Sequence, residues 1–346
     1  MPPTNRVCRA ALGLVTVGLA LLLASCAGLG ATTVNGSGAT FPKLFYEEAI
    51  AELEAVDDAI VVNYNAVGSG QGKKDLAAET SDWAGTDSTV KESEVGSFPR
   101  PFLYVPTVAA PITVSYNLAG VDDLRLSPDT LAGIFTGQIR RWDDTRVVAD
   151  NPDLSLPAEP ITVAARADGS GTTANFSRYL AKAAPGTFTV TPGDKVEWPT
   201  AQAARGNAGV TQLIQDTPGS IGYVDYSDAV PAGLTFAAIR NRDGRYVEPS
   251  VESASAALAG AVVADDLTYD PLDAAGPDAY PITAPTYVLV YETYGSSSTV
   301  EGVRRWLTFL LTSGQDLAPT VDFAPLPEDL RQRALAQVEA IHEEGT

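Results

Sequence analysis

The chain has 346 residues, of which 45% are apolar and 19% charged, and this balance suits a globular protein of two domains better than one large core or a disordered chain. The formal net charge of -20 argues against nucleic acid or an anionic membrane surface as a partner, because both attract an excess of Lys and Arg. An anionic small molecule is not excluded, because net charge governs long-range steering, whereas a buried anion site depends on a few local donors.

The first 26 residues have the pattern of an export signal. Arg6 and Arg9 precede an apolar run over residues 10–23, which ends in a Leu-Ala-Ser-Cys sequence at Cys26. About 14 apolar residues are too few to cross a hydrocarbon layer of roughly 30 Å, so a permanent membrane helix is the weaker interpretation. The sequence therefore predicts an exported protein.

Cys26 is the expected lipidation site, because Leu-Ala-Ser-Cys resembles a bacterial lipobox, in which the signal is cut before the cysteine and lipid is attached there. The alternative is a plain secretory signal with an incidental cysteine. Cys8 leaves with the signal, so the mature body holds no free thiol and no disulfide. Residues 27–33 are small and lack a hydrophobic period, which predicts a tether between the lipid and the folded body.

One pattern occurs three times: a β-like apolar run, a Gly/Ser turn, then a segment of helical period. The runs are residues 32–35, 60–65 and 161–165, and the turns are residues 36–40, 68–72 and 166–172. This alternation is typical of an α/β fold. The first helix is expected from about Phe41, with Leu44, Phe45, Ile50 and Leu53 on its apolar side.

Further elements follow from the same periodicities. Strands are expected at residues 110–116, 221–224 and 287–291, and an amphipathic helix at 299–312. A last helix is expected at 327–343, with acidic Glu328 and Asp329 in its first turn. Residues 249–285 are rich in Ala, Asp and Pro and predict one short helix and a domain boundary.

The three Gly/Ser turns precede helices, where unpaired backbone N–H groups and the positive end of the helix dipole favour an anion. Each turn also carries hydroxyls: Thr40 in the first, Ser69 in the second, and Ser170 with Thr172 in the third. The alternative is that such turns only reverse the chain, as most do.

Arg166 and Asp168 open the third turn. A guanidinium offers a planar fork of donors to a tetrahedral oxyanion, and a carboxylate two residues away can hold that fork in place. The alternative is a surface ion pair without a function.

Asp87 follows the run Trp-Ala-Gly-Thr, and a carboxylate repels an anion unless the ligand brings a proton to donate. Phosphate near neutral pH has such a proton and sulfate has none, so an Asp in the site favours phosphate. The alternative is a helix N-cap or turn aspartate.

Four segments resemble the ligand motifs of the phosphate-binding component of the high-affinity phosphate ABC transporter. They are Gly-Ala-Thr-Phe-Pro at 38–42, Gly-Ser at 68–69, Thr-Asp at 86–87 and Arg-Ala-Asp-Gly-Ser-Gly-Thr at 166–172. Segments 134–139, 142–144, 206–209 and 219–224 add to the likeness, which spans roughly Gly36 to the C-terminal helix. Two departures are Gly70-Gln71, where the family commonly has Ser-Gly, and Thr86, where Ser is common.

The resemblance implies a role for each motif residue. Thr40 and Phe41 give backbone or hydroxyl donors, Ser69 gives both kinds, and Asp87 accepts the phosphate proton. Arg166 gives charge-assisted bonds while Asp168 restrains it, and the implied donors of the third turn are Ser170, Gly171 and Thr172.

The resemblance also implies a class II periplasmic-binding-protein fold, with two α/β lobes joined by two crossover strands and the ligand in the cleft. We expect residues 34–108 and 284–346 to form a discontinuous domain I and residues 109–283 to form domain II. The expected crossovers lie near residues 106–110 and 280–284. The implied partners are inorganic phosphate and the permease of an ABC importer, and the implied location is the outer face of the cytoplasmic membrane of a bacterium. A monomer without a cofactor or metal is expected.

Other functions were weighed against this interpretation. A secreted phosphatase is disfavoured because the single histidine, His342, lies in the expected C-terminal helix, which leaves no His cluster for zinc and no ready catalytic triad. The same fold could bind sulfate, molybdate or an organic phosphate, and a phosphate sensor or adhesin without transport differs only in its partner. The sequence therefore predicts a binding protein and not an enzyme.

Overall fold

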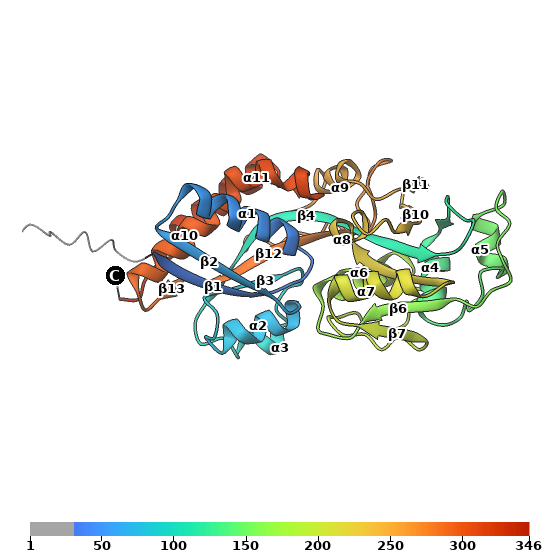
Figure 1. Cartoon of the computed structure of the whole chain (residues 1–346), viewed down its shortest axis with the longest axis horizontal. Coiled ribbons are helices and arrows are strands. Elements are labelled where there is room, and N and C mark those ends of the chain that lie inside the picture. The colour runs from blue at the N-terminus through green and yellow to red at the C-terminus, as the bar shows by residue number, and fades with distance from the viewer. Residues whose placement is uncertain (1–30, 346) are drawn as a thin grey trace, which may run out of the picture.

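The computed structural model describes residues 31–345 as two α/β lobes that share one continuous sheet (Figure 1). The strand order is β2-β1-β3-β12-β4-β8-β6-β7, with β9 and β14 paired to β4 beside this path. Strand β4 (Phe102–Asn117) serves both lobes: residues 102–111 pair with β12, and residues 112–117 pair with β8. We call the lobe on the β12 side lobe I and the lobe on the β8 side lobe II.

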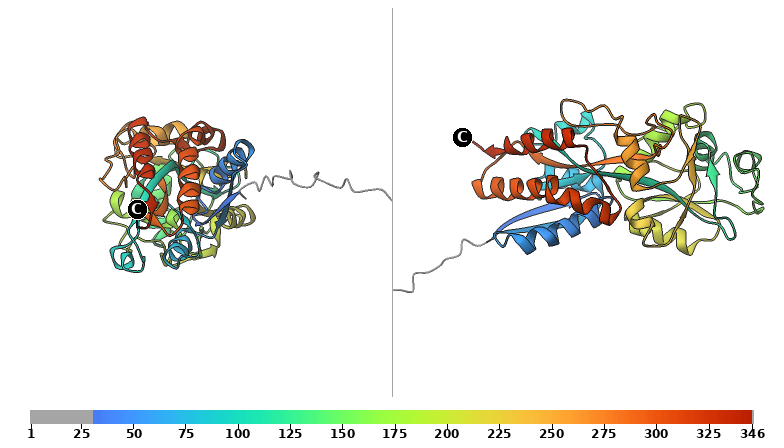
Figure 2. Two further views of the ribbon diagram at one scale, coloured as in Figure 1. Left: turned by 90° about the vertical axis from the view of Figure 1, so that its left-hand side faces the viewer. Right: turned by 90° about the horizontal axis from the view of Figure 1, so that it is seen from above.

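Lobe I contains both ends of the described chain. Its remaining strands are β1 (Thr32–Gly38), β2 (Ile60–Ala66), β3 (Trp83–Thr86), β12 (Thr283–Tyr291), β13 (Thr293–Tyr294), β14 (Ala324–Pro325) and β15 (His342–Glu343). Its helices are α1 (Lys43–Val56), α2 (Ser69–Ala77), α3 (Glu92–Val95), α10 (Ser297–Leu311), α11 (Ser313–Leu317), the 3-10 turn η1 (Ala318–Val321) and α12 (Glu328–Glu339). Figure 2 shows α10 and α12 on one side of this sheet, with the C-terminus at the end far from lobe II.

Lobe II is built from the middle of the chain. Its strands besides β4 are β5 (Arg125–Leu126), β6 (Thr162–Arg166), β7 (Ala201–Ala204), β8 (Ser220–Asp225), β9 (Thr235–Phe236), β10 (Ala238–Arg240) and β11 (Tyr246–Val247). Its helices are α4 (Pro128–Phe135), α5 (Thr145–Asp150), α6 (Gly171–Ala183), α7 (Gly206–Asp216) and α8 (Tyr226–Ala229). Helix α9 (Val251–Leu258) packs against β4, β12 and β14, where the lobes meet.

The α/β fold predicted from the three strand–turn–helix units is confirmed, and so is the two-lobe architecture that the resemblance implied. The expected strand at 110–116 is longer because β4 runs through the first crossover and changes partners between Pro111 and Ile112. The chain returns to lobe I at Thr283, the first residue of β12. The residue boundaries proposed for the two domains, 108/109 and 283/284, stay a prediction.

The helical stripes follow the apolar period. In α10 the expected residues Val303, Trp306, Leu307, Leu310 and Leu311 are all buried. In α1 the buried residues are Phe45, Tyr46, Ala49 and Leu53. The prediction for Leu44 is wrong, because Leu44 precedes this stripe by about 100° of helical rotation and is 36% exposed.

Two predictions near the chain ends are corrected. The expected tether 27–33 overlaps the sheet, because Thr32 and Thr33 pair with Ile60 and Val61 at the start of β1. The last helix ends at Glu339 and not at 343, because His342 leaves it to pair with Thr293 as part of β15. The signal segment 1–26 and the lipidation site Cys26 lie outside the described residues.

Candidate anion-binding site

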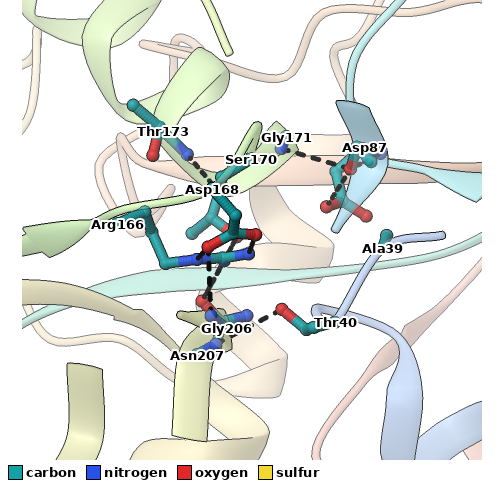
Figure 3. Close-up of polar contacts among 12 residues, drawn as sticks. Ala39, Thr40, Asp87, Arg166, Asp168, Ser170, Gly171, Thr173, Gly206 and Asn207 are labelled. Carbon is teal, nitrogen blue, oxygen red and sulfur yellow. Dashed lines mark hydrogen bonds and ion pairs between the residues drawn. The ribbon is translucent and has the colours of Figure 1, made fainter. Parts of the chain in front are cut away.

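The first turn is positioned by a close approach of two strands. Gly38 ends β1 with φ +143°, and a Cβ there would lie 2.1 Å from the carbonyl oxygen of Gly85 in β3, so only glycine fits. The next amide, that of Ala39, donates to the same oxygen at 2.8 Å. This geometry turns the chain so that Thr40 faces lobe II (Figure 3), where its Oγ1 accepts from the backbone N–H of Asn207 at 3.3 Å.

The side chain and the backbone amide of Phe41, the residue after Thr40, have different surroundings. Its ring is fully buried in the core, 5.9 Å from the ring of Phe323 in an edge-on arrangement. Its amide makes no hydrogen bond to another residue within 31–345. The side chain therefore fixes the turn, and the amide is the group of Phe41 that can face a ligand.

Ser69 begins α2 and contacts lobe II across the cleft. Its Oγ accepts from the backbone N–H of Gly171 at 3.1 Å and lies 3.2 Å from Oδ2 of Asp87. The following amide, of Gly70, donates to the carbonyl of Gly169 at 2.9 Å. The second and third turns are thus in direct contact, although about 100 residues separate them.

Asp87 lies directly after β3 and is buried. Its Oδ1 accepts from Thr286 Oγ1 at 2.8 Å, and its backbone carbonyl accepts from Asn175 Nδ2 at 2.5 Å. Burial raises the pKa of Asp87 to about 7, although the hydrogen bonds from Thr286 and Ser69 and the charge of Arg166 oppose that rise. The carboxyl group therefore exchanges a proton near neutral pH. It caps no helix among residues 31–345, so the N-cap interpretation considered for Asp87 does not apply.

Arg166 ends β6 with its guanidinium engaged on two edges. Nε and Nη2 donate to Oδ1 and Oδ2 of Asp168 at 2.9 and 2.5 Å, and Nη1 donates to Asn207 Oδ1 at 2.9 Å. The side chains of Arg166 and Asp168 are 1% and 11% exposed, so the alternative of a surface ion pair is wrong. Burial works to raise the pKa of Asp168, but the bonds and charge of Arg166 outweigh it, and the pKa is lowered.

The third turn leads into the N-terminus of α6. Ser170 is the N-cap, since its Oγ accepts from the backbone N–H of Thr173 at 3.1 Å. Gly171 faces lobe I so closely that a Cβ there would lie 2.7 Å from Cβ of Asp87. Thr172 Oγ1 lies 3.4 Å from Arg166 Nη1. The helix therefore points its positive end at Ser69 and Asp87.

The predicted site residues are thus brought to one place between the lobes. Lobe I contributes Thr40, Phe41, Ser69 and Asp87, and lobe II contributes Arg166, Asp168, Ser170, Gly171 and Thr172. The donors come from two helix N-termini, a guanidinium and hydroxyls, and the single buried carboxylic acid among them is Asp87. The arrangement can hold a small oxyanion that keeps a proton.

The chain is similar in sequence to phosphate-binding proteins over most of its length. Residues 26–313 match the sequence profile of the PBP superfamily domain. A protein of Methanocaldococcus jannaschii named phosphate-binding protein PstS is 33% identical, over 96% of this chain and 95% of the relative. A protein of the same name from Haemophilus influenzae is also 33% identical, over 87% of this chain and 90% of the relative.

The chain belongs to the PstS family.

Solved structures agree with the fold of a PstS-family protein. The high affinity periplasmic phosphate-binding protein PfluDING, solved with phosphate bound, superposes with a TM-score of 0.74 at 23% identity, covering 88% of this chain and 93% of its own. A phosphate ABC transporter substrate-binding protein described as putative, from Clostridium perfringens, gives a TM-score of 0.63 at 18% identity, covering 85% and 100%. These likenesses confirm the periplasmic-binding-protein fold.

Three further residues contact the candidate site and were not predicted as members of it. Asn207 is buried, accepts from Arg166, and has an Nδ2 group without a partner among residues 31–345. Thr286 donates to the carboxyl group of Asp87, and Asn175 donates to its backbone carbonyl. Asn207 lies in the Gly-Asn-Ala-Gly segment at the start of α7, and the turn before a helix was a signal that could have pointed to it.

Proposed function

We propose that this chain binds inorganic phosphate between its two lobes and delivers it to an ABC-type phosphate importer. The observation that carries the proposal is the buried carboxyl group of Asp87 beside the N-terminus of α6. A donor-rich anion site with one proton-accepting group selects an oxyanion that carries a proton. The family supports it, because the relatives are named phosphate-binding proteins.

The roles that we propose follow the geometry. Thr40 and the amide of Phe41 donate from the turn before α1, Ser69 from the start of α2, and Ser170, Gly171 and Thr172 from the N-terminal end of α6. Arg166 supplies charge-assisted bonds and Asp168 fixes its plane. Asp87 accepts the phosphate proton, or shares its own when it is protonated.

The decisive experiment is calorimetric titration of the chain from Ala27 with phosphate and, separately, with sulfate. Residues 31–345 contain the contacts of both lobes described above, so this chain holds the whole site. We expect tight one-to-one binding of phosphate and no binding of sulfate. Absence of heat and of a thermal shift with phosphate would show the proposal to be wrong, and other oxyanions and phosphatase substrates would be tested next.

We also propose that the protein is not an enzyme and works as a monomer. Within residues 31–345 no group of three or more His, Cys, Asp and Glu side chains could hold a metal ion. His342 pairs with β13 at the end of lobe I, on another element than any residue of the site. Incubation with phosphate monoesters tests the first point, since release of phosphate at a rate above that of a protein-free blank would contradict it.

We propose that the mature protein is lipid-anchored through Cys26 on the outer face of the cytoplasmic membrane, with residues 34–108 and 284–346 as domain I nearest the anchor and 109–283 as domain II. Within residues 31–345 no helix has the length and hydropathy of a membrane span. Strand β1 starts at Thr32, so the anchor is joined directly to lobe I. Membrane fractionation of wild type and Cys26→Ala tests this, and retention of the variant on the membrane would contradict it.

A further inference from the structure

A basic cavity lies beside the proposed phosphate site, between the two lobes. Its volume is about 950 Å³ and it is lined from lobe I and lobe II alike. Its lining includes Asp168 and Gly169, which belong to the third turn, and Gly70, whose amide bonds to Gly169. The cavity therefore ends at the loop that the proposed function assigns to phosphate.

The cavity collects cations from a chain that has few. Only six lysines occur in the sequence, and four of them line this cavity: Lys73, Lys74, Lys91 and Lys195. Arg205 adds a fifth cation. In a protein of net charge -20, such a concentration at one place is a local reversal of sign.

Pairing leaves most of this charge uncompensated. The three acidic residues of the lining are Glu94, Asp168 and Asp194. Asp168 is bound to Arg166 and Asp194 to Lys73. Four exposed cations remain, Lys74, Lys91, Lys195 and Arg205, none of which forms an ion pair within residues 31–345, against the one carboxylate of Glu94.

A second, smaller cavity reaches Asp87 and differs in charge from the basic cavity. It has a volume of about 230 Å³ and is lined by Asp87 itself, together with Arg178 and Asp270. Arg178 and Asp270 form an ion pair of 3.3 Å. The lining of this cavity therefore offers an anion no unpaired cation and includes the carboxyl group of Asp87.

We propose that the four unpaired cations Lys74, Lys91, Lys195 and Arg205, here called the lysine rim, form an outer anion-binding site that holds phosphate weakly before the lobes close on it. The inference rests on the proposed function. An anion approaching a protein of this net charge is repelled at long range, and a cationic cleft mouth restores a favourable path over the last Debye length, about 10 Å at 0.1 M salt. The lysine rim attracts any small anion by its charge. The inner site distinguishes phosphate from sulfate, because Asp87 accepts a proton that only phosphate carries.

The test is stopped-flow association of phosphate, followed by tryptophan fluorescence, at ionic strengths from about 10 mM to about 500 mM. The rim variant is Lys74→Gln with Lys195→Gln, one residue from each lobe. The matched control is Arg242→Gln with Arg245→Gln, two exposed residues of the β10–β11 turn, which changes net charge equally. Thermal denaturation checks that both double variants are folded. If one of them is not folded, its two single-substitution variants are measured instead.

We expect the rim variant to associate about 3- to 10-fold more slowly at low salt, with an unchanged dissociation rate and a difference that vanishes at high salt. The control stays within about twofold of wild type at all salt concentrations. If both variants associate alike, or if the rim variant is slower by the same factor at every salt concentration, the rim is not an anion site. If the wild type itself does not bind phosphate, the proposed function is wrong, and the proposal for the lysine rim is wrong with it.

Discussion

Nζ of Lys73 in lobe I lies 2.7 Å from Oδ2 of Asp194 in lobe II, and both side chains are nearly buried, at 6% and 12% exposure. Ser88 Oγ donates to the other oxygen of Asp194 at 2.7 Å, and the backbone carbonyl of Asp194 accepts from the N–H of Ser170 at 2.9 Å. The pair thus joins the two lobes and contacts the N-cap of α6. Asp194 therefore links the contact between the lobes to the third turn.

Asp194→Asn is expected to weaken phosphate binding by at least about tenfold, because closing the lobes then buries the charge of Lys73 without a full counter-charge. The melting temperature of the protein is expected to fall as well, because the contact between the lobes buries Lys73 in the same way. Titration calorimetry and thermal denaturation measure the two quantities. The control is Asp57→Asn, which removes a part-exposed ion pair with Arg305 inside lobe I and is expected to leave affinity unchanged. Equal affinities of the two variants would contradict the role of the pair.

Asp87→Asn is expected to remove a pH dependence of stability. Because burial raises the pKa of Asp87 to about 7, the folded state keeps a proton that the unfolded state, with a pKa of about 3.9, has already lost. The favourable contribution is complete below about pH 4 and is lost as pH rises to about 7. The ligand-free wild type should therefore lose stability relative to Asp87→Asn between pH 4 and pH 7, measured by denaturant titration at each pH. A constant difference across this window would contradict the prediction.

The same substitution is expected to change ligand preference. An amide replaces the proton acceptor with a group that can also donate, so phosphate loses a partner for its proton and sulfate loses an unpaired acceptor. We expect the ratio of phosphate to sulfate affinity to fall by about tenfold or more at pH 8, where the wild-type carboxyl is ionised. Competition titrations with both anions measure it, and an unchanged ratio would place Asp87 outside the recognition of the ligand.

Arg166→Lys is expected to weaken phosphate binding by at least about tenfold, because an ammonium group cannot occupy Asp168 with two parallel bonds and reach Asn207 as well. The matched control is Arg146→Lys, which alters an Arg–Asp pair of the same sequence separation, with Asp144, that is exposed. Calorimetry on both variants separates the buried fork from its surface counterpart. A comparable affinity loss in the control would show that the effect is not specific to the site.

Gly38→Ala is expected to lower the free energy of unfolding by roughly 2 kcal/mol or more, because the added Cβ meets the backbone of Gly85 at 2.1 Å and the φ of +143° is strained for alanine. Gly96→Ala is the control, since a Cβ there meets nothing within 4 Å. Chemical denaturation measures both. Similar values for the two variants would show that β1 and β3 can move apart to admit the methyl group.

The parts of the site that could be predicted from the sequence are local. A turn of Gly and hydroxyl residues before an apolar helical period carries its own signal, and Arg166 and Asp168 are close enough in sequence that their contact follows from spacing. The residues that hold these groups from afar carry no such signal. Thr286 reaches Asp87 across 199 positions, and Asp194 reaches Lys73 across 121.

In the fold, too, the local features could be predicted from the sequence and the long-range pairings could not. The strand–turn–helix units and the α10 stripe were predicted because each is periodic within a short window. The full length of β4 was not, since its 16 residues belong to two lobes and its two halves have different partners. Similarly, His342 leaves α12 because β13 offers its backbone a partner, which no helical period of residues 327–343 can reveal.

The position of β12 has a consequence for how the polypeptide reaches its native state. This strand pairs with β3 on one side and β4 on the other, so the sheet of lobe I stays divided until residues 283–291 arrive. The strands of lobe II lie within residues 112–247, apart from those of lobe I, and can pair earlier. The sheet of lobe I is completed only by a contact between segments about 200 residues apart in sequence. Contacts of such large sequence separation form slowly during folding. The half of the protein that would be joined to the membrane is therefore the half that folds last, after nearly the whole chain has been made.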